Sequence, residues 1–400
     1  MPAPFTPSAN IAQLKESATI AVSQRAKALK AQGRPIIDLS VGEPDFATPQ
    51  FIREAAIAAM AAGQTRYTAV EGVLPLREAI AAQANRHYRG ADPILPTEVV
   101  VSGGSKQSIF NACTVLFGPG DEVLVPTPSW TSYYEIVQLA RATPVPVHGS
   151  AARSLKVTAE ELAAAATPAT RGVMLNSPCN PTGAVYTADE LRAILALAET
   201  HGWWVLSDEI YLRIAYEAPA TSALDVATTR DRLIVINGVA KAYAMTGWRI
   251  GWTIAPRAVT QAMTALQSQV TSNPSSISQY GALAALTQET EAEAAIAAML
   301  AQFRIRRDGA LAILATSSAL SWVHPAGAFY LYLDVSAFAA RAAGAEPGFA
   351  LAQHLLEAHN VAAVPGGAFH TPNWLRCSYA APEADVLEAM RRIVIALDGG

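Results

Sequence analysis

The stretch Trp203-Trp-Val-Leu-Ser-Asp-Glu-Ile-Tyr211 holds the pattern that decides the fold of this chain. A short apolar run ends at Ser207 and two carboxylates follow directly, which is typical of a buried strand that ends at a polar edge of a sheet. A buried carboxylate at that edge needs a cationic or proton-donating partner, so Asp208 is a candidate site residue. The alternative is that Asp208 caps the N-terminus of a following helix.

Six further short apolar runs occur before and after this stretch, and most are separated by segments long enough for a crossover helix. They are Val99–Val101, Glu122–Val125, Pro144–Val147, Gly172–Leu175, Leu233–Ile236 and Trp248–Ile254. Together with Trp204–Ser207 they predict an α/β fold in which helices cover a mostly parallel, seven-stranded sheet.

A chain of 400 residues exceeds what one compact core usually needs, so we expect two domains. Pro274–Ala315 is expected to form one or two long helices, and the sequence after it changes character. There we predict a smaller α+β domain, with a strand, a helix and two short strands at Phe329–Asp334, Phe349–Ala358, Ala362–Val364 and Leu375–Tyr379. The expected division is a large domain over residues 46–295, a small domain over 296–400, and an N-terminal segment, 1–45, that joins the small domain.

The composition argues against several classes of function. The formal net charge of −4 offers no general attraction to nucleic acid or to acidic membranes. The first residues lack the pattern of a signal peptide, and no apolar run is long enough to span a bilayer. The three cysteines, Cys113, Cys179 and Cys377, have neither zinc-ligand spacing nor a disulfide framework. We therefore expect a cytoplasmic protein without a bound metal.

The turn after the first predicted strand, Val99-Val-Val-Ser-Gly-Gly-Ser-Lys-Gln107, is a candidate anion site. A strand, a Gly-Ser turn and a helix start present backbone N–H groups at the positive end of a helix, where phosphate binds. Such a turn also connects strands to helices for structural reasons alone. It matches neither the dinucleotide fingerprint nor the P-loop, which argues against a dehydrogenase.

Two other stretches follow predicted strands. Asn176-Ser-Pro-Cys-Asn-Pro-Thr-Gly183 is a stiff turn that presents the Asn180 amide at the sheet edge where open α/β sheets bind ligands. Asn237-Gly-Val-Ala-Lys-Ala-Tyr-Ala-Met-Thr-Gly-Trp-Arg-Ile-Gly251 places Lys241 among small and apolar residues. Desolvation there lowers the pKa of an amine and makes it a nucleophile toward an aldehyde. Taken singly, Asn180 also fits an ordinary turn and Lys241 a solvated surface group.

In this order, the four stretches resemble the fold-type-I, class I aminotransferases, which depend on pyridoxal phosphate. The chain is most similar to the bacterial aspartate aminotransferases, including the aspartate/prephenate type, and the resemblance runs from Ser17 to about Tyr379. It implies transamination between an L-amino acid and a 2-oxo acid by a ping-pong mechanism. For this branch it implies aspartate or glutamate as donor, with 2-oxoglutarate, oxaloacetate or prephenate as acceptor.

By matching positions, the resemblance implies how the chain holds its cofactor. Lys241 would hold pyridoxal phosphate as a Schiff base and move the substrate proton. Asp208 would pair with the ring nitrogen, and Tyr211 and Asn180 would hydrogen-bond the ring hydroxyl. Trp130 would stack on the ring face. The implied phosphate ligands are Gly104, Ser105, Lys106 and Arg249.

The resemblance also implies a homodimer with shared active sites, in which Tyr67 reaches the phosphate of the neighbouring subunit. Gly42 and Arg376 resemble the binders of the substrate α-carboxylate, with Trp130 and Asn180 beside the substrate. Lys15 resembles a lysine that attracts the distal carboxylate of acidic substrates; the alternative is an exposed pair of Lys15 and its neighbour at a helix start.

Four residues depart from the family pattern. Gly238 lacks a hydroxyl that many relatives place three residues before the lysine, and Ala240 replaces a frequent serine. A phosphate contact is therefore expected to be missing or to come from the backbone. Ser129 stands where an aromatic residue is usual, and Tyr134 replaces a common proline. These changes are expected to affect substrate shape more than the type of reaction.

Two alternatives stay open at this point. A carbon–sulfur lyase, racemase or synthase on the same scaffold would also keep Lys241, Asp208 and Arg376. A non-enzymatic alternative is a cofactor-binding regulator. Such proteins usually carry an additional DNA-binding domain, for which the short N-terminal segment and the net charge leave no room.

Overall fold

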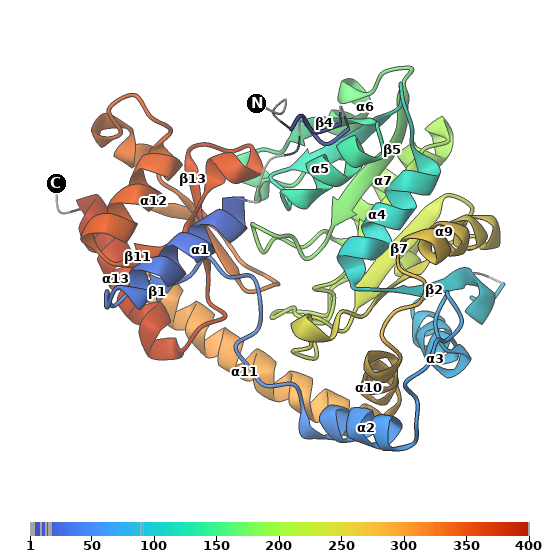
Figure 1. Ribbon diagram of the computed structural model, residues 1–400. Helices are drawn as coiled ribbons and strands as arrows, with labels where there is room; N and C mark the ends of the chain where they lie inside the picture. Colours follow the sequence, from blue (N-terminus) through green and yellow to red (C-terminus); the bar gives the residue numbers. More distant parts are fainter. Residues whose placement is uncertain are drawn as a thin grey trace.

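The computed structural model describes residues 5–8, 10–12, 14, 18–88, 90 and 92–398. Figure 1 shows a larger and a smaller body connected by one long helix, α11 (Glu289–Leu314). The smaller body combines α1 (Ala18–Ala31), drawn in blue, with the C-terminal elements drawn in orange and red.

The larger body is built on a seven-stranded sheet in the order β2-β8-β7-β6-β5-β3-β4. Its strands are β2 (Val99–Ser102), β3 (Glu122–Thr127), β4 (Thr143–His148), β5 (Thr170–Asn176), β6 (Trp204–Asp208), β7 (Leu233–Gly238) and β8 (Gly251–Ile254). Every pairing is parallel except those of β8, which runs antiparallel to both of its neighbours. The predicted mostly parallel, seven-stranded sheet is therefore confirmed.

One strand of this sheet is shorter than predicted. The prediction began the strand at Trp248, but Thr246–Trp248 is a single turn of 3₁₀-helix. Arg249 then has a φ of 56°, in the left-handed region. A residue in that conformation cannot continue an extended strand, so β8 begins only at Gly251.

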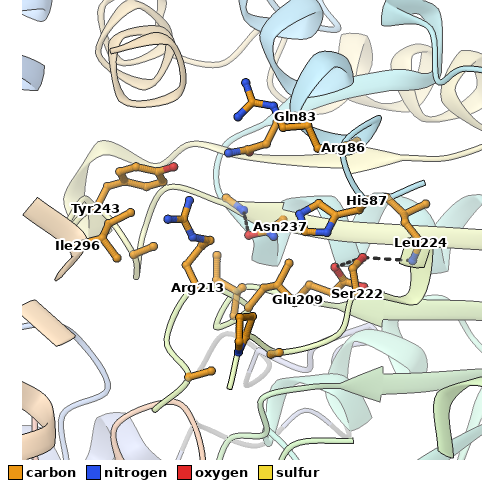
Figure 2. A pocket seen from close by; sticks show the side chains of 18 of the residues that line it. Gln83, Arg86, His87, Glu209, Arg213, Ser222, Leu224, Asn237, Tyr243 and Ile296 are labelled. Atoms are coloured by element: carbon orange, nitrogen blue, oxygen red, sulfur yellow. Dashed lines mark hydrogen bonds between the residues drawn. The ribbon is translucent and has the colours of Figure 1, made fainter. Parts of the chain in front are cut away.

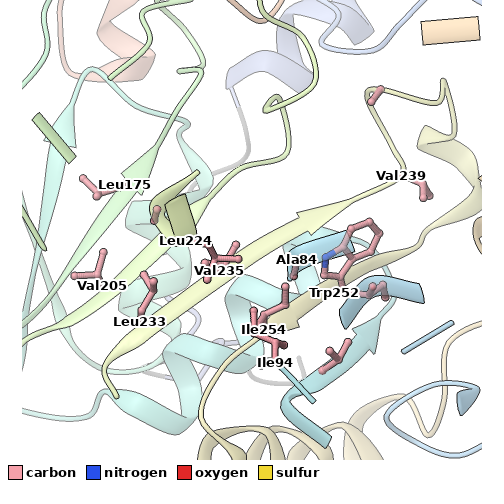
Figure 3. Close-up of a cluster of buried hydrophobic side chains, with 14 of the residues drawn as sticks. Ala84, Ile94, Leu175, Val205, Leu224, Leu233, Val235, Val239, Trp252 and Ile254 are labelled. Atoms are coloured by element: carbon pink, nitrogen blue, oxygen red, sulfur yellow. The ribbon is translucent and has the colours of Figure 1, made fainter. Parts of the chain in front are cut away.

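Side chains alternate between the two faces of the central strands, and both faces are buried. In β7, Val235 faces one apolar core, which Figure 3 shows together with Val205 and Trp252. Its neighbours Ile234 and Ile236 face a second core. A parallel sheet between two helix layers requires apolar side chains on both faces, which is why continuous apolar runs predicted these strands.

Helices cover both faces of the large sheet. The core around Ile234 is covered by α4 (Ser105–Leu116), α5 (Ser132–Leu139) and α9 (Arg257–Val270). The core around Val235 is covered by helices from distant parts of the chain: α2 (Gln50–Ala61), α3 (Leu74–Ala84), α6 (Ala159–Ala165), α7 (Ala188–His201), α8 (Ala223–Val226) and α10 (Ser276–Thr287). The carboxyl ends of the parallel strands remain as the edge at which ligands bind in such folds.

The smaller body contains an antiparallel sheet formed by β12 (Val364–Pro365), β13 (Trp374–Ser378), β10 (Tyr330–Asp334) and β9 (Ser321–Val323). The helices α12 (Pro347–Ala358) and α13 (Glu383–Asp398) pack beside it. The predicted strand Ala362–Val364 is instead two short strands in different sheets. β11 (Val361–Ala362) pairs with β1 (Ile37–Asp38), and the chain passes at Ala363 to β12 in the antiparallel sheet.

The helix α11 contributes to the cores of both bodies. Its side chains enter the core of the larger body up to Ile296 and the core of the smaller body from Met299 onward. The N-terminal segment packs on the smaller body, where Leu29 shares a cluster with Ala362. We keep as a proposal the division into residues 1–45, 46–295 and 296–400, with its second boundary inside α11.

Within the described ranges, no helix combines the length and the apolar character needed to cross a membrane. In the same residues, no group of three or more His, Cys, Asp or Glu side chains is arranged to hold a metal ion. The cysteines Cys113, Cys179 and Cys377 are all free thiols.

Candidate active site

The four stretches singled out in the sequence meet at the carboxyl end of the large sheet and enclose a cavity of about 420 Å³. We call it the site cavity. Side chains of the smaller body, from β10 and β13, complete its wall. The predicted site residues that line it are Gly42, Ser105, Lys106, Trp130, Asn180, Asp208, Tyr211, Lys241, Arg249 and Arg376.

Lys241 follows β7, and its side chain is half-buried in the wall of the site cavity. The amine donates a hydrogen bond to the carbonyl oxygen of Gly42 and lies 5.8 Å from the ring centroids of Tyr211 and Phe329. Desolvation lowers the pKa of this amine from 10.5 to about 8, although the nearby Glu43 opposes the shift. Lys241 is therefore not a solvated surface group, and near neutral pH part of it is available as a nucleophile or base.

Asp208 ends β6 and is buried, with 3% of its surface exposed. The hydroxyl of Tyr133 donates to Oδ2 over 2.6 Å, and the backbone N–H of Ile210 donates to Oδ1 over 3.1 Å. Burial raises the pKa of the carboxyl from 3.8 to about 6, against the lowering effect of these hydrogen bonds and of Lys241. The site cavity thus brings a buried carboxylate and a desolvated amine together.

One end of the site cavity is cationic. The helix α4 begins there at Ser105, and the side chains of Lys106 and Arg249 line the same region. Gly104 has a φ of 94°, and a Cβ at this position would lie 2.5 Å from a guanidinium nitrogen of Arg249, so only glycine fits the turn. Burial lowers the pKa of Lys106, and Arg249 lowers it further. Two neighbouring cations at a helix N-terminus fit an anion such as phosphate.

Arg376 lies on β13 and is 1% exposed. Its Nη1 donates to Oδ1 of Asn180 over 3.0 Å, and its Nη2 donates to the carbonyl oxygen of Ser40 over 2.7 Å. Among the described residues its Nε has no hydrogen-bond partner, although the atom is buried. A buried guanidinium with unused hydrogen-bonding capacity is suited to a carboxylate ligand.

The aromatic residues predicted for the site lie between these charged groups. The hydroxyls of Tyr211 and Tyr330 are 2.8 Å apart. The Trp130 ring stands edge-on to the Tyr133 ring with centroids 5.4 Å apart, and the amine of Lys106 lies 4.8 Å from the Trp130 centroid. These rings supply the flat, partly apolar surfaces that an aromatic cofactor needs.

The structure accounts for three of the four departures from the family pattern. A Cβ on Gly238 would approach the carbonyl oxygen of Ile250 to 2.9 Å, so no side chain fits there. Ser129 and Tyr134 form one polar group with Thr127: the Tyr134 hydroxyl lies 2.6 Å from that of Thr127 and accepts from Ser129 over 3.3 Å. Neither Ser129 nor Tyr134 lines the site cavity.

Two of the predicted residues do not line the site cavity, and a third is not among the described residues. Gly104 shapes the turn beside the site cavity without lining it. Tyr67 projects from the surface with 89% of its area exposed. Lys15 falls outside the described residues.

Sequence reasoning missed Tyr133, Tyr330 and Glu43, which also line the site cavity. A weak signal existed for Tyr133, because it lies three residues after Trp130 and on the first turn of a helix. No local signal existed for Tyr330, since its partner Tyr211 is 119 positions away in the sequence.

A larger cavity, of about 550 Å³, shares Ile210 in its wall with the site cavity and holds none of the predicted site residues. We call it the second cavity. Figure 2 shows Glu209 and Arg213 among the residues that line it. Arg213 is paired with Glu293, with two N–O distances of 2.8 and 2.6 Å.

Glu209, not Asp208, accepts hydrogen bonds from the start of the helix that follows β6. Oε1 of Glu209 accepts from the backbone N–H of Ala223 over 2.8 Å, and Oε2 accepts from the hydroxyl of Ser222 over 2.7 Å. The cap residue of α8 is Ser222. The alternative in which Asp208 caps a helix is therefore wrong, because turns follow β6 and the next helix begins only at Ala223.

The chain was compared with known proteins. A family model described as aminotransferase class I and II matches residues 34–393. The chain is 42% identical to an aspartate aminotransferase of Streptomyces avermitilis over 392 residues, which cover 96% of this chain and 95% of that protein. It is 41% identical over 390 residues to an aspartate/prephenate aminotransferase of Cereibacter sphaeroides, with 96% of both chains covered.

Comparison with solved structures leads to the same family. The aspartate aminotransferase of Thermus thermophilus with maleate matches with a TM-score of 0.92 and 38% identity, covering 98% of this chain and 100% of that one. Fold and site together define a pyridoxal-phosphate-dependent enzyme of fold type I. The chain belongs to the class I and II aminotransferase family and catalyses transamination. These relationships favour transamination over the lyase, racemase, synthase and regulator alternatives.

Proposed function

We propose that the site cavity is the transamination site and that Lys241 and Asp208 are its central residues. One observation carries this proposal: a desolvated lysine amine and a buried carboxylate line the same cavity. Pyridoxal phosphate, when bound, supplies an aldehyde and an electron-accepting ring that stabilises negative charge on the substrate α-carbon. The donor set fits this group, with an amine for the aldehyde, a carboxylate for the ring nitrogen and a cationic helix terminus for the phosphate.

Lys241 has two tasks in this proposal. Its unprotonated amine would be the point of covalent attachment for the cofactor aldehyde, and the free Nζ would be the base that takes the proton from the substrate α-carbon. With a pKa of about 8, roughly a tenth of the amine is unprotonated at pH 7. The carbonyl oxygen of Gly42 holds this nitrogen in place by accepting its hydrogen bond.

Asp208, in its ionised form, keeps the ring nitrogen protonated and so maintains the electron-accepting character of the ring. We assign the hydrogen bonds to the ring hydroxyl to Tyr211 and Asn180, and contact with the ring face to Trp130. The phosphate is assigned to the start of α4 with Gly104, Ser105, Lys106 and Arg249.

Arg376 is proposed to bind the substrate α-carboxylate. Its Nε lacks a partner among the described residues, and the bond to Asn180 orients the guanidinium. A carboxylate that approaches this fork gains a two-pronged, charge-assisted contact. Gly42 lies at the same wall of the site cavity, where its carbonyl also meets Lys241.

We propose aspartate or glutamate as amino donor and 2-oxoglutarate or oxaloacetate as acceptor, with prephenate as a further acceptor. The names of the relatives support this class of substrate. Thr19, four residues after Lys15, lines the site cavity, and its hydroxyl is buried without a partner among the described residues. A residue this close in sequence to Lys15 at the wall of the site cavity supports the proposed role of Lys15 at a distal carboxylate.

We also propose a cytoplasmic homodimer with shared sites. Tyr67 is exposed, and the helices on either side of it expose Ile57, Met60 and Leu74 as well, a pattern suited to a surface that a second copy covers. Three free thiols fit a reducing compartment.

A panel of amino donors and 2-oxo acids tests the proposed function with purified protein. Acidic donors are expected to react faster than neutral ones, and product is expected only when a 2-oxo acid acceptor is present. Lys15→Ala should slow acidic donors selectively. Equal loss for aspartate and alanine would remove Lys15 from the site, and turnover without an acceptor would point to a lyase or racemase.

A further inference from the structure

We propose that Tyr133 is a positioning residue whose hydroxyl holds the Asp208 carboxylate in the orientation and charge state needed at the cofactor ring nitrogen. The inference rests on the proposed function, in which Asp208 meets that nitrogen. Tyr133 lies on the first turn of α5 and is 1% exposed. Its hydroxyl is the donor in a 2.6 Å hydrogen bond to Asp208.

Asp208 is fixed at both of its oxygens. Tyr133 donates to Oδ2, and the backbone N–H of Ile210 donates to Oδ1. Two donors from different elements prevent the carboxylate from rotating, while each oxygen keeps a free lone pair. Because Asp208 also lines the site cavity, this lone-pair capacity is available to a bound ring.

Burial disfavours the ionised form of Asp208, so this form needs neighbouring groups that stabilise its negative charge. The titratable groups that face it are Tyr133, Lys241, Cys179 and Tyr211. Of these side chains, only Tyr133 donates a hydrogen bond to it within the described part of the chain. Burial and the neighbouring carboxylate both raise the pKa of Tyr133, so its hydroxyl keeps its proton and stays a donor. A charge-assisted bond of this kind favours the ionised carboxylate.

The Tyr133 ring has a second contact. It stands edge-on to Trp130, at an interplanar angle of 89°. Tyr133 thus contacts both Asp208, which we propose at the ring nitrogen, and Trp130, which we propose at the ring face. Tyr133→Phe keeps the ring and removes only the hydroxyl, so it isolates the bond to Asp208.

The adjacent residue provides a matched control. Tyr134 is also buried, and its hydroxyl bonds to Thr127 and Ser129. Tyr134→Phe therefore makes the same chemical change on the same helix turn without touching Asp208. Any loss that comes only from removing a buried tyrosine hydroxyl should occur in both variants.

The experiment compares holoenzymes of wild type, Tyr133→Phe, Tyr134→Phe and Asp208→Asn. The readouts are the rate of pyridoxal phosphate loss on dilution, kcat and KM for aspartate, the pH dependence of kcat and the melting temperature. For Tyr133→Phe we expect cofactor loss to be faster and kcat lower by roughly tenfold to a hundredfold. KM should change little, and the acidic limb of the pH profile should move to higher pH, because Asp208 then ionises less readily.

Tyr134→Phe should stay within about threefold of wild type. If Tyr133→Phe matches Tyr134→Phe in every readout while Asp208→Asn is impaired, the role of Tyr133 is overturned and the proposed function stands. If Asp208→Asn itself behaves like wild type, the proposed role of Asp208 fails instead.

Two further variants keep the test decisive. On the Asp208→Asn background, Tyr133→Phe should add no further loss of kcat, because Tyr133 acts through the carboxylate; full additivity would contradict this. If Tyr133→Phe folds poorly, 3-fluorotyrosine at position 133 keeps the shape of the side chain with a more acidic hydroxyl. A stronger donor should move the acidic limb to lower pH, and a shift in the other direction would overturn the proposal.

Discussion

The site cavity and the second cavity share Ile210, and consecutive carboxylates at the end of β6 enter them, Asp208 the first and Glu209 the second. Both carboxylates are buried, and burial raises the pKa of Asp208 to about 6 and that of Glu209 to about 7. The burial and the raised pKa of these carboxylates therefore do not show which cavity binds a ligand. Cavity size does not show it either, since the second cavity is the larger one.

The difference lies in unused hydrogen-bonding capacity. In the second cavity Glu209 receives three donors from the protein, and Arg213 is paired with Glu293. In the site cavity, Arg376 and Thr19 each keep a buried polar atom without a partner among the described residues. A cavity whose polar groups satisfy one another is structural, whereas one with unsatisfied groups is prepared for a ligand.

The strongest test of this contrast is Lys241→Ala. It should lower transamination by at least about a thousandfold, because the attachment point and the base are lost together. Arg213→Ala in the second cavity should leave turnover within about threefold. Steady-state rates give the comparison, and borohydride reduction followed by peptide mapping locates the cofactor. Cofactor fixed to another lysine would refute the assignment.

Asp208→Asn should reduce kcat by roughly a hundredfold or more in a folded protein, since a neutral amide cannot keep the ring nitrogen protonated. Circular dichroism and the melting temperature check folding. Turnover near that of wild type would mean that Asp208, like Glu209, has only a structural role.

Arg376→Lys should impair the reaction of every amino acid substrate, with kcat/KM lower by roughly tenfold to a hundredfold. The reason is that a point charge cannot reproduce a two-pronged contact with the carboxylate. The measurement is kcat/KM for aspartate, glutamate and alanine. A defect confined to the dicarboxylic substrates would instead place Arg376 at the distal carboxylate.

Tyr67→Phe should weaken cofactor retention by about tenfold without unfolding the protein, since the hydrogen bond that we propose from Tyr67 to the phosphate would be lost. Mixing Tyr67→Phe subunits with Lys241→Ala subunits tests whether sites are shared. With shared sites, one site of the mixed dimer carries both defects and the other is intact. Absence of fully active sites in the mixture would show that each site is made by one chain.

Glu209→Gln should have the smallest effect on activity, within about twofold of wild type. Its effect is expected on stability. Because the pKa of Glu209 is raised from 4.5 to about 7, the folded protein keeps a proton that the unfolded chain has released. Its contribution to stability therefore falls as the pH rises from about 4.5 to about 7. Glu209→Gln should remove this part of the pH dependence of the melting temperature. If the melting temperature of Glu209→Gln depends on pH as that of wild type does, this assignment to Glu209 is wrong.

The sequence alone predicted the strands and the four site stretches, because both are local. Buried parallel strands need continuous apolar runs. Residues at the end of such a strand, such as Asp208, or shortly after it, such as Lys241, lie at one sheet edge in any fold of this class. The same locality explains the errors. The left-handed φ of Arg249 and the break at Ala363 depend on packing that no short pattern encodes.

Only the tertiary structure decided which distant residues meet. Arg376 reaches Asn180 across 196 positions, Tyr211 reaches Tyr330 across 119, and Tyr133 reaches Asp208 across 75. The sequence determined the residue types available at the sheet edge. Which of two adjacent carboxylates lines the site cavity, and which binds the start of a helix, followed from the turn after β6 and from the donors that surround each oxygen. Charge and orientation in a buried site depend on those contacts.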